Sequence, residues 1–293
     1  MTTLAHAVGF GLVTAAIVAV SAVAFSLQYA VTDVPNFAHG ELLTISAYTA
    51  YETQRRGLGL ITGLVIGCLA AGVLAFLMYR VVLRSFMRRS TRLVYTVAVT
   101  AGIALVVENA LGLIYGNGDV NLVVPYEQAR HVGPFLWTNI DLTIALGGLI
   151  VLAAVHAVLR YTAFGRAQRA VSDNKELALA SGVRTERVIA LTWVMAGVVG
   201  GLAGVALASS RATFGPLFGN DFLLVTLAAA VVGGVGRVYG AMAGALIIGV
   251  VTEVSGAYLS AGYKQVAALT ILAIVLLVRP SGLLNVQRGG AEA

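Results

Sequence analysis

Long stretches without a charged side chain restrict what this sequence can fold into. The residues from Ala7 to Thr32, from Gly57 to Tyr79 and from Val188 to Ser210 carry no charge. A helix needs about 20 apolar residues to cross a bilayer, so each stretch can form a membrane span. Hydrophobic residues make up 59% of the 293-residue chain and charged residues 11%, which is too little polar surface for a soluble domain of this length. The sequence therefore predicts an all-α polytopic membrane protein.

The expected architecture is a single transmembrane domain over residues 1–293. It should have about eight transmembrane helices with broken or re-entrant segments and a cytoplasmic coupling helix. Glycine-rich runs such as "GVVGGLAGVALA" (197–208) and "GAMAGALIIG" (240–249) are typical of helices whose backbones approach closely in lipid. The other interpretation is that these glycines only reflect composition.

Several functional classes lack support in the sequence. Cys68 is the single cysteine, which excludes an intrachain disulfide and a cysteine metal site. The histidines have no metal-ligand spacing, no nucleophile–base arrangement stands out, and neither a metal site nor an enzyme is expected. The net charge of +6 comes mainly from short loops between spans, so it does not indicate nucleic-acid binding. Neither lysine lies in a P-loop motif, so energy for transport must come from a partner or an ion gradient.

Basic residues predict the orientation in the membrane. A basic cluster follows the span that begins at Gly57, and it consists of Arg80, Arg84, Arg88, Arg89 and Arg92. The positive-inside rule places that end in the cytoplasm, and by alternation residues of about 115–139 form an outer loop. The apolar stretch 222–236 is short, which indicates a short, tilted or re-entrant span. The orientation of the first two segments stays open, because Arg55 and Arg56 would lie outside.

The apolar pattern first breaks in "TDVPNFAHGELL" (32–43). Proline cannot continue a helix, and irregular backbone at membrane depth is tolerated only beside protein or a watery cavity. The segment is therefore a broken helix, a re-entrant hairpin or a tight loop. The candidate residues of a translocation path are Asn36, His39 and Glu41, with the "VGGVG" glycines Gly233, Gly234 and Gly236. In the alternative interpretation Asn36 caps the next helix, while His39 and Glu41 hold the turn.

Residues of about 161–187 form a dense polar segment between two apolar runs. Both flanks are expected at the cytoplasmic face. Asp173 can cap a short helix, with Glu176 three residues later, and Gly182 suits the left-handed position after the last turn. Two turns are marginal alone in water, so such a helix needs a surface to dock on. From the residues alone, a partner protein and the membrane surface are equally good candidates.

This segment resembles the cytoplasmic coupling loop of ABC-importer permeases, in particular the branched-chain amino acid permeases of the LivH type. The family pattern G-R-A-x-R-A, continuing to R-V-I-A-L-T, is matched from Gly165 to Thr192. Further motifs match in the same order: "NFAHGE" (36–41), "AAVVGGVGRVYGAMAGALIIGV" (229–250) and "AYLSAGYKQV" through "VRPSGLL" (257–284). The resemblance covers nearly the whole chain.

The chain departs from the family pattern in two places. Before the asparagine the family usually has Y-G-x-x-G-x-(I/L)-N, where this sequence has Ala30, Asp33 and Pro35 in place of two glycines and an aliphatic residue. Arg237 replaces a small residue. These departures bear on the geometry of the first break.

The resemblance implies one permease of an ATP-driven importer in a bacterial inner membrane. Its partners would be a related second permease, two cytoplasmic ABC ATPases and an extracytoplasmic solute-binding protein. This chain would hold no cofactor itself, because ATP and Mg²⁺ would be bound by the ATPases. The implied solute is a branched-chain amino acid or a related small polar solute. The residues expected to couple to the ATPases are Gly165, Arg166, Arg169, Asp173, Glu176, Leu177, Ala178, Ala180, Ser181 and Gly182.

Two other functions are weighed against this one. A stand-alone channel or secondary transporter for urea or short amides would need charged pairs inside the membrane for ion coupling. Most charges here lie in loops instead. A purely structural membrane subunit would have no use for the coupling segment.

Overall fold

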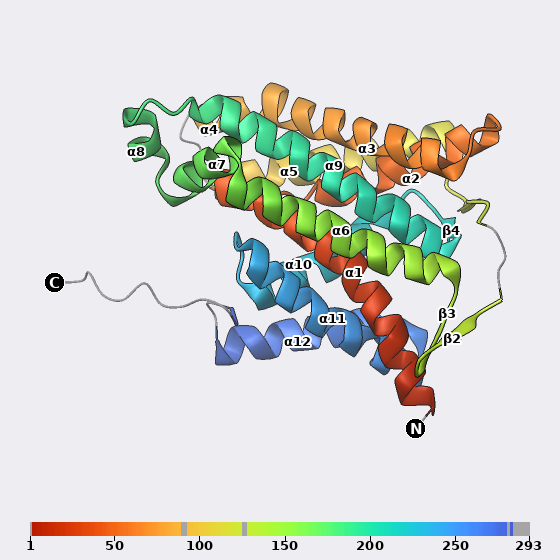
Figure 1. Cartoon of the computed structure of the whole chain (residues 1–293). Coiled ribbons are helices and arrows are strands. Elements are labelled where there is room, and N and C mark those ends of the chain that lie inside the picture. Colours follow the sequence, from red (N-terminus) through yellow and green to blue (C-terminus); the bar gives the residue numbers. More distant parts are fainter. Residues whose placement is uncertain (1, 89–92, 125–127, 280–281, 284–293) are drawn as a thin grey trace.

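A computed structural model describes residues 2–88, 93–124, 128–279 and 282–283. Over these residues the chain is a bundle of α-helices with two small β-ribbons, which confirms the all-α polytopic fold (Figure 1). Seven helical segments are long and apolar enough to cross a membrane: Leu4–Thr32, Leu60–Met87, Leu93–Tyr115, Asn139–Tyr161, Thr185–Arg211, Val238–Tyr258 and Ala261–Val278. Two shorter helices, α2 and α10, lie among them.

The helices follow one another with short connections. In chain order they are α1 (Thr2–Thr32), α2 (His39–Arg55), α3 (Leu60–Leu77), the π-helical turn η1 (Met78–Leu83), α4 (Arg84–Arg88), α5 (Leu93–Tyr115), α6 (Asn139–Tyr161), α7 (Ala163–Asp173), α8 (Lys175–Ala180), α9 (Thr185–Arg211), α10 (Phe218–Gly233), α11 (Val238–Tyr258), the 3₁₀ turn η2 (Ala261–Tyr263) and α12 (Lys264–Val278). The antiparallel ribbons pair β1 (Val120–Asn121) with β4 (Thr213–Phe214), and β2 (Arg130–Val132) with β3 (Phe135–Trp137).

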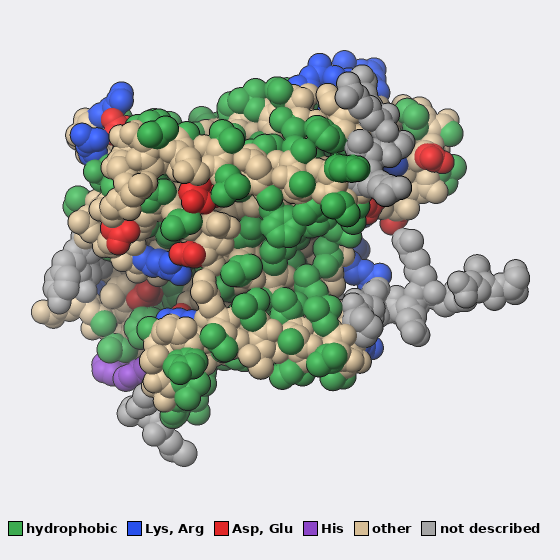
Figure 2. Space-filling model, turned by 180° about the vertical axis from the view of Figure 1, so that it is seen from behind, with side chains coloured by type: hydrophobic (Ala, Val, Ile, Leu, Met, Phe, Trp, Pro, Cys, Tyr) green, Lys and Arg blue, Asp and Glu red, His purple; other side chains and the backbone are tan. Residues whose placement is uncertain are grey.

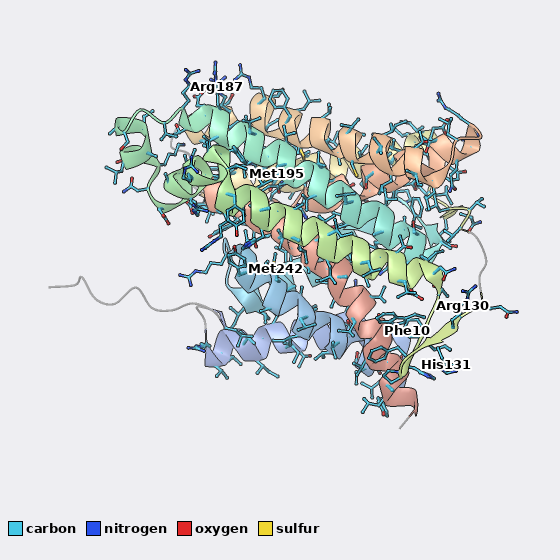
Figure 3. All side chains as sticks on the ribbon, viewed as in Figure 1. Phe10, Arg130, His131, Arg187, Met195 and Met242 are labelled. Atoms are coloured by element: carbon cyan, nitrogen blue, oxygen red, sulfur yellow. The ribbon has the colours of Figure 1, made fainter. Side chains whose placement is uncertain are left out.

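Charged side chains gather toward the two ends of the bundle, and the band between them is mostly apolar (Figure 2). One end carries α4, α7 and α8, with Arg187 beside them, whereas Arg130 and the ribbons lie at the opposite end (Figure 3). The positive-inside rule makes the α4 end cytoplasmic. Arg89 and Arg92 of the basic cluster lie outside the described residues.

The orientation of the first two helices follows from this frame. The N-terminus lies at the outer end, so α1 runs inward and α2 returns outward (Figure 1). Arg55 and Arg56 therefore lie at the outer end, where the positive-inside rule disfavours them. Both pair with Glu52, at 3.3 and 2.9 Å, which partly neutralises their charge.

Glycines allow the helix backbones to approach closely, as their spacing predicted. Helix α9 packs against α3 and α2 through its small residues. A Cβ added at Gly197 would lie 2.6 Å from the carbonyl oxygen of Ala71. One added at Gly204 would lie 2.4 Å from the carbonyl oxygen of Leu43. Tight backbone contact of this kind drives helix association in lipid, where burial of apolar surface contributes little.

The first break is a reversal between α1 and α2. Asp33 begins it with a φ of +53°, a left-handed conformation that glycine adopts most easily and that Asp tolerates. This is the position of the second glycine in the family pattern, which explains why a short polar residue can stand there. Partial burial raises the pKa of the Asp33 carboxyl above its usual range, and the positive charge of Lys175 offsets part of that shift.

Valine at position 33 is expected to destabilise the turn. A β-branched residue at positive φ costs about 1–2 kcal/mol, so Asp33→Val should lower the thermal stability of the detergent-purified protein. Asp33→Gly should unfold within a few degrees of the parent chain, since glycine adopts this conformation freely. Equal melting temperatures for the two variants would contradict the left-handed turn.

Candidate functional site

A chain of buried polar side chains crosses the bundle from α1 through α2 to α10. Asn36 Nδ2 donates to Gln28 Oε1 at 3.0 Å, and His39 Nδ1 lies 3.3 Å from the same oxygen. On its other side His39 Nε2 is 3.3 Å from Ser21 Oγ, which is 3.0 Å from Thr226 Oγ1. Each of the five side chains is at most 1% exposed. Because Gln28 Oε1 only accepts, the arrangement puts the proton of a neutral His39 on Nδ1.

Helices α2 and α10 cross in backbone contact beside this polar chain. A Cβ on Gly219 would lie 1.9 Å from the carbonyl oxygen of Gly40, and a Cβ on Gly40 would lie 2.5 Å from that of Gly219. The Gly219 N–H donates to Thr44 Oγ1 at 3.1 Å. The two short helices are therefore locked together near their N-terminal ends, and only glycine fits at the crossing.

Glu41 is the most unusual residue of this region. Its side chain is 1% exposed, and neither carboxylate oxygen has a hydrogen-bond partner among the described residues. It lies within electrostatic range of Glu108 on α5. A buried carboxylate without partners is costly, which sets Glu41 apart from the hydrogen-bonded polar groups of the neighbouring chain.

The expected path residues separate into two sets. Asn36 and His39 share Gln28 Oε1 as a hydrogen-bond partner, and Glu41 is buried two residues further along α2. Asn36 Oδ1 also accepts the Ala38 N–H at 3.1 Å, so the residue holds the turn as well as contacting α1. The N-cap position of α2 is Ala38, which has no side-chain cap, so Asn36 holds the turn without capping the helix. A role of Asn36 in the translocation path stays a prediction.

The glycines of "VGGVG" lie elsewhere, in the tight turn between α10 and α11. Gly234 and Gly236 have φ values of +106° and +79°. A Cβ on Gly233 would lie 1.8 Å from the carbonyl oxygen of Gly240, and one on Gly236 would meet the Tyr29 ring at 3.2 Å. Their contacts shape a hairpin at the cytoplasmic end, and none of these residues takes part in the polar chain.

Sequence reasoning missed Ser21, Gln28 and Thr226. All three lie inside apolar runs, where a single polar residue does not change the hydrophobic pattern enough to mark a site. Their polarity alone could have identified them, because a polar side chain at membrane depth usually faces other protein groups or a cavity.

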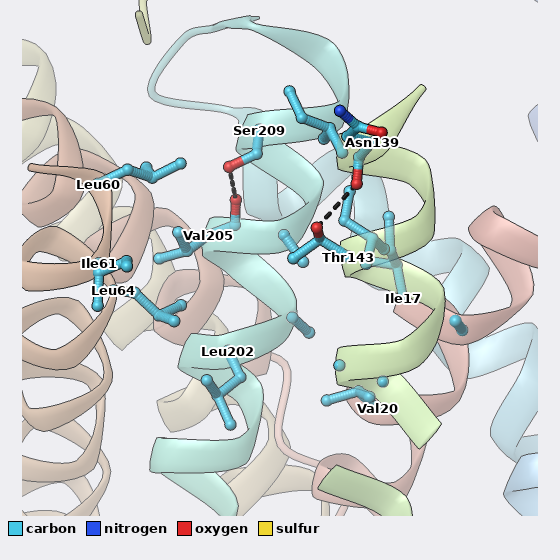
Figure 4. A pocket seen from close by; sticks show the side chains of 17 residues that line it. Ile17, Val20, Leu60, Ile61, Leu64, Asn139, Thr143, Leu202, Val205 and Ser209 are labelled. Atoms are coloured by element: carbon cyan, nitrogen blue, oxygen red, sulfur yellow. Dashed lines mark hydrogen bonds between the residues drawn. The ribbon is translucent and has the colours of Figure 1, made fainter. Parts of the chain in front are cut away.

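An apolar groove of about 390 Å³ lies between α3 and α6, over α9 (Figure 4). Leu60, Leu64 and Leu202 are among its lining residues. The hydroxyls of Thr143 and Ser209 donate to carbonyl oxygens of their own helices, at 2.8 Å each. Both hydroxyls are thus already satisfied, and most of the remaining lining is apolar, so the groove suits hydrocarbon better than a polar solute.

The polar segment 161–187 folds into α7, α8 and the start of α9. Asp173, expected to cap the short helix, is the last residue of α7 instead. The cap of α8 is Asn174, whose extended backbone lets Oδ1 accept the Leu177 N–H at 2.9 Å. The expectation for Asp173 is wrong by one residue, because α7 continues through that position and shifts the start of α8.

The C-terminal end of α8 is a Schellman motif. Gly182 has a φ of +84°, and its N–H donates to Leu179 O at 3.0 Å. The Val183 N–H donates to Ala178 O, also at 3.0 Å. These two bonds satisfy the last carbonyls of the helix and fix its length.

One residue of the docking surface expected on α8 is buried. Ala178 is 4% exposed and belongs to an apolar cluster inside the chain, so it anchors α8 and is not accessible to a partner. Leu177 and Leu179 are 64% and 62% exposed, although Leu179 was not among the expected residues. Glu176, Ala180 and Ser181 are also exposed.

Three further residues of the segment belong to α7. A Cβ on Gly165 would lie 2.2 Å from the carbonyl oxygen of Leu159, so glycine is needed where α7 turns against α6. The Arg169 guanidinium donates to the same carbonyl oxygen. Both residues therefore hold α7 in place, whereas Arg166 is exposed at the surface.

Comparison with known proteins places the chain in a family. A family model described as "Branched-chain amino acid transport system / permease component" matches residues 7–278. The chain is 32% identical over 281 residues to the high-affinity branched-chain amino acid transport system permease protein LivH of Escherichia coli K12, with 91% of each chain covered. It is 25% identical to the corresponding permease protein BraD of Pseudomonas aeruginosa, with 94% of each covered. The ribose import permease protein RbsC of Bacillus subtilis is 32% identical over 60% of this chain.

A solved structure supports the fold. PsaBC from Streptococcus pneumoniae, determined in complex with Fab, aligns with a TM-score of 0.53 over 94% of this chain and 93% of that one, at 12% identity. The similarity at this identity concerns the fold alone. The seven apolar spans, the matched family model and the LivH relatives agree with one another. The chain belongs to the branched-chain amino acid transport permease family and is a multi-pass permease subunit of an ABC importer of the bacterial inner membrane.

Proposed function

We propose that this permease imports branched-chain amino acids. It would work with a related second permease, two cytoplasmic ABC ATPases that bind ATP and Mg²⁺, and an extracytoplasmic solute-binding protein. The observation that carries the proposal is the 32% identity to LivH over 91% of both chains. This chain supplies the path and the coupling helix, while hydrolysis takes place on the ATPases.

Helix α8 is the proposed docking element for an ATPase. It exposes Leu177 and Leu179 at the cytoplasmic end, and its two turns are too short to be stable alone. Its buried residue Ala178 shares an apolar cluster with Val31 and Ala38, which flank the α1–α2 reversal. Movement of α8 would therefore reach the reversal as a rigid-body displacement.

The alternative of a stand-alone channel or secondary transporter is not favoured. Ion coupling would require charged pairs inside the membrane. The ion pair of Arg84 with Glu186 lies at the cytoplasmic ends of α4 and α9, and that of Lys264 with Glu253 lies at the outer end. These two pairs of described residues join helix ends and do not lie in the middle of the bundle.

Co-purification tests the proposed assembly. The tagged chain would be extracted gently from native membranes and its partners identified by mass spectrometry. We expect two ATPases, a second permease and a solute-binding protein. A chain that purifies alone and still moves solute in vesicles without ATP would contradict the proposal.

Enlarging Ala178 should uncouple hydrolysis from uptake. Leucine at this buried position displaces α8 from its apolar cluster, at a cost of about 1–3 kcal/mol in packing. We expect Ala178→Leu to keep ATP hydrolysis by the complex while the uptake per ATP falls about tenfold, measured in proteoliposomes. Ala170→Leu on the exposed face of α7, outside the expected coupling residues, is the matched control for the same change of residue. Normal uptake per ATP in Ala178→Leu would contradict the proposed transmission.

A further inference from the structure

A cavity of about 280 Å³ lies at the outer end of the bundle, where helices distant in sequence meet. Arg211 is the last residue of α9, Asp221 lies in the first turn of α10, and Glu253 lies on α11. Lys264 begins α12 and also lines the cavity. Phe10 of α1, another lining residue, lies beside the outer β2–β3 ribbon (Figure 3).

Two side chains of this cavity carry opposite charges that are not paired within the described part of the chain. The Arg211 guanidinium lies over the Phe218 ring, 5.8 Å from its centroid, and has no described carboxylate oxygen within 4.0 Å. Asp221 and Glu253 are both close enough to Arg211 to interact with it electrostatically, and the Asp221 carboxylate accepts no hydrogen bond from the described residues. The Arg211 and Asp221 side chains therefore keep hydrogen-bonding capacity for a ligand.

Most other polar groups of the cavity are already hydrogen-bonded, and they include the lining residue Asp141, which accepts from Thr138. Glu253 accepts hydrogen bonds from Thr14 Oγ1 at 2.9 Å and from Lys264 Nζ at 2.7 Å. The apolar part of the wall consists of Phe10, Val13, Ile17, Leu207, Phe222 and Val225. Among the described residues, the cavity thus combines a cation and an anion without a hydrogen-bonded charged partner, Arg211 and Asp221, with an aliphatic and aromatic surface.

The cavity lies directly outward of the buried polar chain. Ile17 lines the cavity, and Ser21 of the polar chain is one helical turn further along α1. In the same way Phe222 lines the cavity, and Thr226 is one turn further along α10. Residues four apart lie on the same face of a helix, so the Ser21–Thr226 hydrogen bond lies one turn inward of these two lining residues.

The combination of groups selects one chemical class of ligand. A free amino acid carries a carboxylate and an ammonium group on the same carbon. A guanidinium binds a carboxylate through two parallel hydrogen bonds, and a carboxylate binds an ammonium group in the same charge-assisted way. A neutral solute such as urea would form neither of these charge-assisted contacts.

We propose that this cavity is an outer-face binding site for a zwitterionic amino acid with an apolar side chain. Arg211 binds the carboxylate, Asp221 binds the ammonium group, and the apolar wall contacts the side chain. The solute rests here before it passes the Ser21–Thr226 hydrogen bond. This inference rests on the proposed function, because the import system must deliver such a solute to this face.

Binding of leucine and of two analogues tests the site without any mutation. Saturation-transfer difference NMR would be recorded on the purified complex in nanodiscs with leucine, with leucinamide, which lacks the carboxylate, and with 4-methylpentanoate, which lacks the ammonium group. We expect a leucine signal and at least about tenfold weaker binding of each analogue, because each loses a charge-assisted contact. Equal binding of leucine and the analogues, or no leucine signal, would overturn the proposal.

Substitutions then locate the signal. Arg211→Gln and Asp221→Asn should each weaken leucine binding about tenfold or more. Arg130→Gln removes an exposed charge at the same end but outside the cavity, so it should leave the signal unchanged. Unchanged leucine binding in Arg211→Gln, together with reduced uptake, would mean that the charge serves protein docking and would refute the site.

Failure of the site and failure of the proposed function give different results. If the function is wrong, the wild-type preparation contains no ATPases and shows no ATP-dependent uptake of leucine. If only the site is wrong, the ATPases co-purify and uptake occurs, but the leucine signal is absent or insensitive to Arg211→Gln and Asp221→Asn.

Discussion

Replacing Gly219 with valine is expected to abolish folded protein. A Cβ at this position would lie 1.9 Å from the Gly40 carbonyl oxygen and 2.3 Å from Thr44 Oγ1, and the first of these is backbone that no rotamer change can move. Overpacking costs about 1–3 kcal/mol even where side chains can adjust, so separation of α2 from α10 should cost at least the upper value. The measurement is the yield of monodisperse protein after detergent extraction and its thermal stability.

Two controls separate this contact from general effects of the substitution. Gly102→Val changes an exposed glycine of α5 with no atom within 4 Å of the added Cβ, and it should behave like the parent chain. Thr44→Val keeps the crossing but removes the acceptor of the Gly219 N–H, which should cost only about 1 kcal/mol. A parent-like yield and melting temperature for Gly219→Val would show that the two short helices do not cross as described.

The double substitution of Leu177 and Leu179 by aspartate should remove the ATPases from the complex. The two side chains are 64% and 62% exposed on the helix proposed to dock, and they make the apolar surface that a partner would bury. Burial of each leucine contributes about 1.5–3 kcal/mol, so the pair accounts for a loss of affinity of about a hundredfold or more. The measurement is the amount of ATPase that co-purifies with the tagged chain.

The permease itself should remain folded, because neither leucine contributes to its core. Leu259→Asp is the matched control, since Leu259 is 70% exposed at the outer end of the bundle. It should retain the ATPases in full. Full retention of the ATPases by the Leu177→Asp/Leu179→Asp chain would place the docking surface elsewhere than α8.

The long spans could be predicted from the sequence because each one is a property of consecutive residues. The stretch from Val188 to Ser210 predicts α9, and the structure extends it only at its ends, to Thr185 and Arg211. Helix α2 was harder to define, since its residues are as polar as they are apolar and it begins at His39, three residues before the apolar run at Leu42. Its position depends on burial among other helices, which no local pattern reports.

Contacts between distant residues account for what the sequence could not predict in the candidate site. His39 was identifiable from the break in the apolar pattern, but its partners Ser21 and Gln28 lie inside an uninterrupted span. Asp173 was predicted to cap α8 because aspartate is a common capping residue. Asn174 caps α8 instead, because α7 extends through position 173. The burial of Ala178 likewise depends on tertiary packing, which the local sequence does not report.

ATP-dependent uptake of leucine by the reconstituted complex tests the central claim most directly. Proteoliposomes would contain the complex co-purified with this chain, with its solute-binding protein and radiolabelled leucine on the outer face of the permease and ATP and Mg²⁺ on the face of α8. We predict accumulation of leucine that stops when ATP is omitted or replaced by a non-hydrolysable analogue. Uptake that proceeds equally without ATP, or accumulation that follows an imposed ion gradient instead, would contradict an ATP-driven permease coupled through α8.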